Sequence, residues 1–254
     1  MRHPSIRSVV LSFLVAAVAW AAPCFAGNKE FHQTYPLERG GTFELQNVNG
    51  PVEIQGWDKN EVEVDAVKIA KGKESDTDRV TIDIEAKPND VAVTTHYPQN
   101  EGVEVAVMYT VHVPHSARVE RLTTVNGTLK VAGVESVADL HTVNGNIEVY
   151  EGGGGVHAHT TNGNVHLELL HCLDELGMTA ETTNGSVLLA VPQTMQANLE
   201  ARSLNGSFYS ELPFSLESSL RPREMRGKFG KGGAPIRLNT INGGIRIEVL
   251  HSTV

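Results

Sequence analysis

The dipeptide Asn-Gly recurs through this chain of 254 residues, and its spacing strongly limits what the chain can fold into. Seven copies occur, and from the second copy onward they are separated by 18, 18, 22, 21 and 37 residues. The copies are Asn49-Gly50, Asn126-Gly127, Asn144-Gly145, Asn162-Gly163, Asn184-Gly185, Asn205-Gly206 and Asn242-Gly243. A period near 20 residues is typical of an array of stacked structural repeats.

The residues on both sides of each Asn-Gly alternate between inward and outward types. Positions four before, three after and five after the Asn are mostly apolar, and position two before it is Thr or Ser in six copies. Alternation with a period of two predicts a strand on each side of the dipeptide. Asn-Gly tolerates positive φ, so we expect a tight corner between the two strands.

Two architectures are compatible with a series of strand–corner–strand units. In a meander, each Asn-Gly would join two antiparallel strands as a hairpin. In a solenoid, each Asn-Gly would be a corner of one coil, and successive coils would stack in parallel. Equivalent positions keep the same residue type from unit to unit, as they should when they lie above one another. This favours an all-β, parallel β-solenoid or roll with coils of about 20 residues, spaced about 4.8 Å apart.

The chain before residue 119 follows a different pattern. Residues 41–54 resemble one repeat unit around Asn49-Gly50, and alternating runs follow at 61–67, 80–84 and 103–113. We interpret these runs as an antiparallel sheet that caps the column, because an open coil exposes unpaired backbone groups. The predicted organisation is a cap region at 27–118 and a solenoid at 119–254, together forming one continuous domain.

A basic stretch lies in the longest gap between repeats. Residues 221–231 contain five Arg or Lys side chains, with glycines among them. We expect an exposed loop there, because such charge runs are usually solvated. The net charge of the whole chain is −9, which gives no argument for nucleic-acid binding.

Residues 1–26 have the pattern of a secretory signal peptide. Arg2 and Arg7 precede an apolar run of 14 residues at 9–22, and Cys24-Phe25-Ala26 offers a cleavage site. An uncleaved anchor or a lipid-modified Cys24 are the alternatives; the run is short for a membrane span, and Pro23 disfavours lipidation. We therefore predict export to the periplasm or cell surface, with no transmembrane span after residue 26. Cys172 then remains alone, as a small buried hydrophobe.

The outward positions suggest one candidate site. Stacking would align five side chains on one face of adjacent coils, with His141 and His159 about 5 Å apart at the backbone. These side chains are Asp139, His141, His157, His159 and Glu181. Imidazoles beside carboxylates are ligands for zinc, copper or nickel, although a solvated face is the simpler interpretation. No other cofactor is predicted.

Catalytic motifs are missing from the sequence. Asp139, Glu148 and Glu181 are outward carboxylates that could serve glycoside hydrolysis, but no unit departs from the repeat to build a cleft around them. No nucleophile elbow, phosphate loop or zinc-protease signature occurs. The sequence therefore predicts a protein that is not an enzyme.

The order of these motifs resembles the bacterial putative adhesin domain family, a domain of unknown function in exported or envelope proteins. The resemblance covers about residues 31–250 and depends on the Gly40-Gly41 start, NVNGPVEIQGWDKNEVEV, Val113-Pro114, the serial Thr-x-Asn-Gly units and GKFGKGGAPIRLNTINGGIRIEV. It implies a β-solenoid-like fold and an envelope role, and it brings no catalytic residues.

Three functions follow from this sequence. The first is a non-enzymatic, adhesin-like solenoid that presents a repetitive polar surface to an envelope polymer or a protein partner. The second is a periplasmic metal-binding protein that uses the His/Asp/Glu face. The third is a structural or stress-related envelope module.

Overall fold

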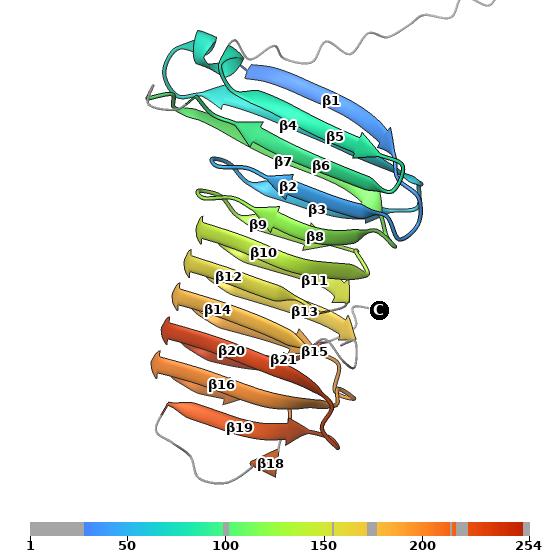
Figure 1. The fold of residues 1–254 in the computed structure, drawn as a ribbon. Coiled ribbons are helices and arrows are strands. Elements are labelled where there is room, and N and C mark those ends of the chain that lie inside the picture. The colour runs from blue at the N-terminus through green and yellow to red at the C-terminus, as the bar shows by residue number, and fades with distance from the viewer. Residues whose placement is uncertain are drawn as a thin grey trace, which may run out of the picture.

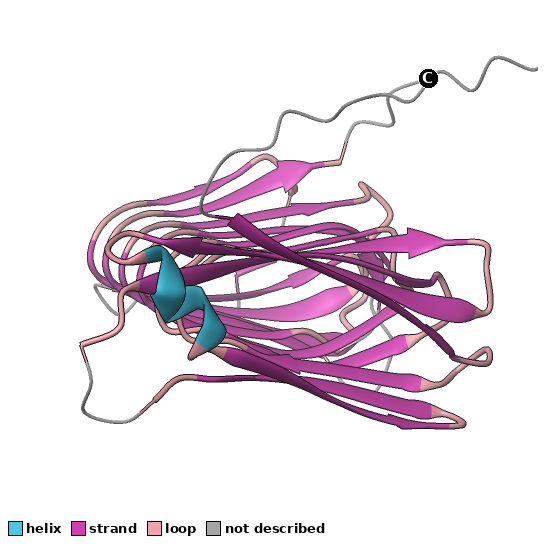
Figure 2. Ribbon diagram, turned by 90° about the horizontal axis from the view of Figure 1, so that it is seen from above, coloured by secondary structure: helices cyan, strands magenta, loops and turns pink. Residues whose placement is uncertain are grey.

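Two long β-sheets face each other along the whole column of the molecule (Figures 1 and 2). The computed structural model describes residues 28–98, 102–153, 155–171, 177–213, 215–216 and 223–250. The predicted signal peptide, Cys172 and Arg221 lie outside the described residues. A single 3-10 helix, η1 (Glu74–Asp78), accompanies the strands in this part of the chain.

Each sheet runs from one end of the column to the other. Sheet A has ten strands in the order β1 (Asn28–Pro36), β4 (Glu61–Ala70), β7 (Val105–Pro114), β3 (Val52–Trp57), β9 (Leu129–Ala132), β11 (Ile147–Gly153), β13 (Val165–His171), β15 (Val187–Val191), β21 (Ile245–Val249) and β17 (Phe208–Ser210). Sheet B has eleven, in the order β5 (Thr81–Lys87), β6 (Asp90–His96), β2 (Thr42–Gln46), β8 (Arg118–Thr123), β10 (Ser136–Asn144), β12 (His157–Asn162), β14 (Met178–Asn184), β20 (Ala234–Asn242), β16 (Ala197–Asn205), β19 (Glu224–Phe229) and β18 (Ser215–Leu216).

Successive strands of the two sheets form the coils of a solenoid. A strand of sheet B passes through an Asn-Gly corner into a strand of sheet A, and neighbouring coils pair in parallel in both sheets. The predicted parallel β-solenoid is therefore confirmed, and a meander of hairpins is excluded. From end to end, the coils are β6–β7, β2–β3, β8–β9, β10–β11, β12–β13, β14–β15, β20–β21 and β16–β17; all but β6–β7 turn at an Asn-Gly corner.

The coils do not stack in the order of the chain. The last coil, β20–β21, lies between β14–β15 and β16–β17, so a red strand separates two orange ones in Figure 1. At the other end, β2–β3 lies between β6–β7 and β8–β9. At each end, two coils that follow one another in the sequence are therefore separated by a third coil from elsewhere in the chain.

Antiparallel strands close both sheets at the cap end and sheet B at the other end, with one difference from the prediction at each end. In the cap region, β1, β4 and β5 are antiparallel to their neighbours, as expected, but β6 and β7 also form a parallel coil on β2–β3. The basic stretch, expected as a loop, contains strand β19, which pairs antiparallel with β16. The backbone groups at the edge of β16 pair with those of this stretch, so it becomes a strand of sheet B. The division at 118/119 stays a prediction, because both sheets run through it.

The inward positions build one continuous core between the sheets. Leu122, Leu140, Ile147 and Val149 are fully buried. The residue two before each Asn, a Thr or Ser in six copies and Asn47 in the first, is also buried. Phe208 is only half-buried, because it lies in β17 at the end of sheet A. Alternation in the sequence therefore identified the core face of the repeats.

The glycines of the corners are required for a reason other than the one expected. Only Gly50, with φ +120°, has positive φ among the seven Asn-Gly glycines. In the others, the backbone passes directly over the neighbouring coil: a Cβ at Gly145 would lie 2.0 Å from the carbonyl oxygen of Gly127, and one at Gly163 2.0 Å from that of Gly145. Close approach of two backbones, rather than a left-handed conformation, excludes a side chain here.

The asparagines form an unbroken hydrogen-bonded ladder along the corner edge. Each side-chain amide donates to the Oδ1 of the Asn in the adjacent coil, over 2.7–2.9 Å, in the order Asn205, Asn242, Asn184, Asn162, Asn144, Asn126 and Asn49. A second ladder lies inside it, where the hydroxyl of Thr160 donates to the carbonyl of Gly145 at 2.9 Å, and its equivalents do the same. All fourteen predicted turn residues thus lie at coil corners and tie the coils together.

Candidate functional site: the polar outer faces of the column

The outer face of sheet B carries the side chains predicted to form a metal site. Strand pairing places Asp139 beside His157, and His141 beside His159, which in turn lies beside Glu181. The predicted neighbours are therefore neighbours in the structure, because the coils in this part of the column do follow the chain order.

Their geometry is a row rather than a cage. The rings of His141 and His159 stack with centroids 5.1 Å apart and planes 3° apart. His159 Nδ1 lies 3.5 Å from Glu181 Oε2, and Asn239 donates a 2.8 Å hydrogen bond to Glu181 Oε1. Within the described chain, no three of the five side chains bring their ligand atoms within 4.8 Å of one another. Metal binding by this row stays a prediction.

The same face carries charges of alternating sign along the column. One row runs through Glu44, Arg121, Asp139, His157, Thr179, Arg237, Glu200 and Arg226. At its lower end, Arg226 binds Glu224 and lies 3.1 Å from Glu200, and Arg202 binds Glu200 as well. The charge of the basic stretch at 221–231 is thus partly neutralised, because Arg226 pairs with Glu224 and Glu200.

The outer face of sheet A presents a second polar row. Glu53, Lys130, Glu148, His166, Leu188 and Arg246 follow one another across adjacent strands. Lys130 donates a 2.9 Å hydrogen bond to Glu53, which lowers the pKa of that carboxyl group. Farther along, Arg246 lies over the ring of Tyr209, which is half exposed.

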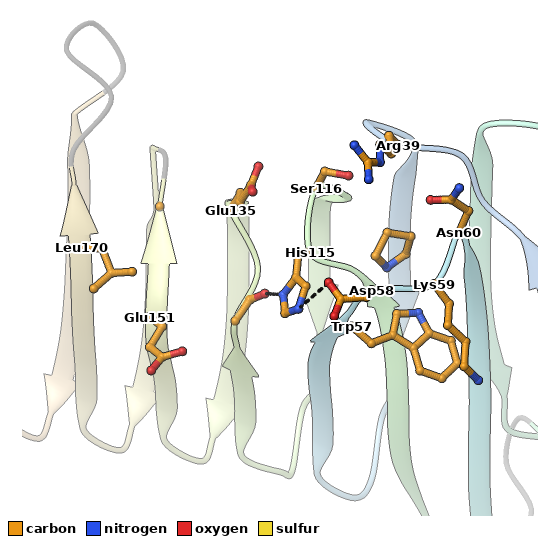
Figure 3. A pocket seen from close by; sticks show the side chains of 13 residues that line it. Arg39, Trp57, Asp58, Lys59, Asn60, His115, Ser116, Glu135, Glu151 and Leu170 are labelled. Carbon is orange, nitrogen blue, oxygen red and sulfur yellow. Dashed lines mark hydrogen bonds and ion pairs between the residues drawn. The ribbon is translucent and has the colours of Figure 1, made fainter. Parts of the chain in front are cut away.

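An open hollow of about 440 Å³ lies on the edge opposite the Asn-Gly corners (Figure 3). His115 lies near its centre, where Nδ1 is 2.6 Å from the carbonyl oxygen of Gly133 and Nε2 is 3.8 Å from Asp58. Lys59 Nζ lies 4.0 Å from the ring centroid of Trp57, whose indole N–H donates to the backbone of Glu61. The ring of Trp57 already has partners, so it is not a free platform for a sugar.

The sequence analysis did not identify one cluster of side chains that could bind a metal ion. Glu63, Asp65 and His112 lie on the outer face of sheet A in the cap region, with their ligand atoms within 4.8 Å of one another. Glu63 and Asp65 are outward positions of an alternating run, which is a visible signal. Their closeness to His112 depends on the pairing of β4 with β7, which the sequence did not indicate.

Comparison with known proteins places the chain in a family. Residues 27–248 match the Toastrack DUF4097 family, so the chain belongs to this family, a domain of unknown function. The predicted resemblance is thereby confirmed at the level of the family. That serial Thr-x-Asn-Gly units characterise the family stays a prediction.

Solved structures share the fold at low sequence identity. A crystal structure described as a putative cell adhesion protein from Clostridium sporogenes ATCC 15579 is 13% identical, with a TM-score of 0.50, over 87% of this chain and all of the other. Another, described as a putative adhesin from Bacteroides fragilis NCTC 9343, is 12% identical, with a TM-score of 0.45, over 87% and 97%. At such identity the first likeness shows the fold alone. No curated protein matches the chain.

The described residues include no helix with the length and hydropathy of a membrane span.

Proposed function

We propose that this protein is a non-enzymatic, exported binding module whose column presents repetitive polar surfaces to an extended envelope polymer or protein partner. One observation carries the proposal: outward side chains lie in register from coil to coil on both sheets, so each face repeats at the spacing of the strands. A partner with its own repeat can make the same contact many times along such a face.

The ladders and the core make the outer faces of the column rigid, and a rigid surface favours binding. The ladders of Asn and buried Thr bond each coil to the next, and the core between the sheets is continuous. Many weak contacts on a preorganised surface add without a large ordering cost, so a deep pocket is not required. The Clostridium sporogenes structure of the same fold, described as a putative cell adhesion protein, is consistent with this role.

The arrangement of outward carboxylates argues against hydrolysis. Glu148 lies in β11 of sheet A, whereas Asp139 and Glu181 lie in sheet B, on the other outer face. Asp139 and Glu181 are separated by strand β12, which puts their backbones about 10 Å apart on an open sheet. A glycosidase needs two carboxyl groups that flank one bond within a groove.

The proposal is tested by co-sedimentation of residues 27–254 with envelope fractions of the source cell. Two triple variants separate the faces: His141→Ser, His159→Ser and Glu181→Gln change sheet B, and Glu148→Gln, His166→Ser and Arg246→Gln change sheet A. We expect binding that survives a chelator, weakens at high salt and falls at least tenfold in one of the two variants. Absence of binding to every fraction, or binding that neither variant changes, would overturn the proposal.

A second candidate function is metal binding by the row on sheet B. The 3.5 Å contact between His159 and Glu181, beside the stacked ring of His141, is the observation that favours it. The sheet B variant separates the two functions. A metal-dependent interaction should disappear when a chelator is added and in that variant alone, whereas binding by charge should survive the chelator.

A further inference from the structure

We propose that Glu63, Asp65 and His112 form a binding site for one divalent transition-metal ion such as Zn²⁺. The site lies on the outer face of sheet A in the cap region, away from the row on sheet B, and does not depend on the proposed binding function. Strand β4 contributes the two carboxylates and the neighbouring strand β7 contributes the imidazole.

The distances suit ligands of a common ion. The ligand atoms of the three side chains lie within 4.8 Å of one another, and His112 Nδ1 is 3.5 Å from Glu63 Oε1. Zinc binds His nitrogen and carboxylate oxygen at about 2.0–2.2 Å in a tetrahedron, which separates two ligand atoms by about 3.4 Å. The site therefore needs little rearrangement to hold the ion.

The imidazole nitrogen that faces this cluster has no other partner. His112 Nδ1 is buried and makes no hydrogen bond, although its side chain keeps 28% of its exposure. A buried polar atom without a partner is costly, and native proteins rarely leave one. Coordination of a metal ion by Nδ1 would satisfy it.

Neighbouring side chains hold the ligands in place. Trp57 stacks on the His112 ring with centroids 5.1 Å apart and planes 22° apart. On the other side, His32 Nδ1 lies 2.6 Å from Asp65 Oδ1, a contact that orients this carboxylate. Such outer partners orient metal ligands and are a regular part of metal sites.

The donor set selects the class of ion. Two carboxylates and one neutral imidazole carry two negative charges, which match a dication. Calcium and magnesium prefer oxygen ligands, whereas a nitrogen donor suits Zn²⁺, Ni²⁺ and Cu²⁺. Three protein ligands leave a fourth position for water.

Trp57 provides a local reporter for this site. The chain contains two Trp residues, Trp20 and Trp57, and only Trp57 is among the described residues. Titration of the full chain with Ni²⁺ or Cu²⁺ should quench Trp57 fluorescence, because the ion would bind to the ring stacked on its indole. A Trp57→Phe variant measures the background from Trp20. Calorimetry with Zn²⁺ then gives stoichiometry and affinity.

Matched variants decide the assignment. We expect one Zn²⁺ per chain, and affinity at least tenfold weaker in Glu63→Gln and in His112→Gln. His96→Gln, which changes an exposed imidazole in β6 outside both candidate sites, is the control and should bind as tightly as the unchanged chain. A double variant, His141→Gln with His159→Gln, shows whether the signal comes from the row on sheet B instead. Zn²⁺ should also raise the melting temperature of the unchanged chain but not of Glu63→Gln, an isosteric change that tests the site even if His112→Gln unfolds.

Three results would overturn the assignment. They are the absence of Zn²⁺ binding at millimolar concentration, binding that survives both ligand variants, and binding that the His141/His159 double variant abolishes. Envelope co-sedimentation in the presence of chelator measures the proposed binding function separately, so either proposal can fail alone.

Discussion

Replacing Gly163 by Ala should destabilise the column strongly, because the structure leaves no room for a single methyl group. The new Cβ would lie 2.0 Å from the carbonyl oxygen of Gly145, 2.5 Å from its carbonyl carbon and 3.1 Å from Asn146 N. Real Cβ contacts essentially never fall below 3.0 Å, so the two coils must separate by about 1 Å at this corner. All three neighbours are backbone atoms, which cannot rotate away.

The magnitude follows from the bonds that this separation stretches. The N–H of Gly145 donates to Asn162 O at 3.0 Å, and the hydroxyl of Thr160 donates to Gly145 O at 2.9 Å. Overpacking costs about 1–3 kcal/mol, and a buried hydroxyl without a partner costs about 1–3 kcal/mol more. We expect a loss of about 3 kcal/mol in the free energy of unfolding, or about 6–12 °C in melting temperature for a chain of this size.

Thermal and urea denaturation of three variants would test this reasoning. Gly72→Ala is the control, because the nearest heavy atom to its Cβ is Asp76 Oδ2 at 3.9 Å, and it should change stability by less than about 0.5 kcal/mol. Gly163→Asn tests whether the glycine is needed for its backbone conformation or for its missing side chain. Asn adopts positive φ readily, but its Cβ would meet the same backbone atoms of Gly145. Stability close to that of the unchanged chain in Gly163→Ala, or in Gly163→Asn, would refute the steric argument.

Other predictions concern the ladders, one ion pair and the inserted coil. Asn162→Ala should cost about 1–2 kcal/mol in urea denaturation, because it removes two exposed ladder bonds. Thr160→Val should cost about 1–3 kcal/mol, and Thr160→Ser should be near neutral, since a Ser makes the equivalent bond at position 203. Lys130 lowers the pKa of Glu53, so this pair stabilises above the ordinary Glu pKa of 4.5 and the effect disappears as pH falls through the lowered value. Glu53→Gln should therefore cost about 0.5 kcal/mol at pH 7, and this cost should shrink as the pH falls below 4.5 and Glu53 becomes protonated. Deletion of residues 234–250 should make residues 197–229 sensitive to protease while the upper coils stay resistant, because β16 loses its link to β14.

Candidate sites show where sequence analysis succeeded and where it could not. His141 and His159 were predicted as neighbours because their coils are consecutive and equal in length, so the repeat alone sets their register. Glu63 and His112 are 49 residues apart, in segments that lack the repeat. Nothing local specifies that β4 pairs with β7, so the cluster they form could not be predicted.

The sequence by itself determined the unit of this protein: strand, Asn-Gly corner and strand, with an alternation that separates core from surface. A local pattern suffices there, because side chains in a strand alternate between its two faces and the same corner recurs. Tertiary structure alone decided the stacking order at the two ends of the column, where coils that are distant in the sequence lie on one another. Every repeat offers similar edges to its neighbours, so β20 can fill the place between β14 and β16 as well as the end of the column. Only the packing of the whole chain selects between these positions, and it also brings the backbones close enough to exclude a side chain at Gly163.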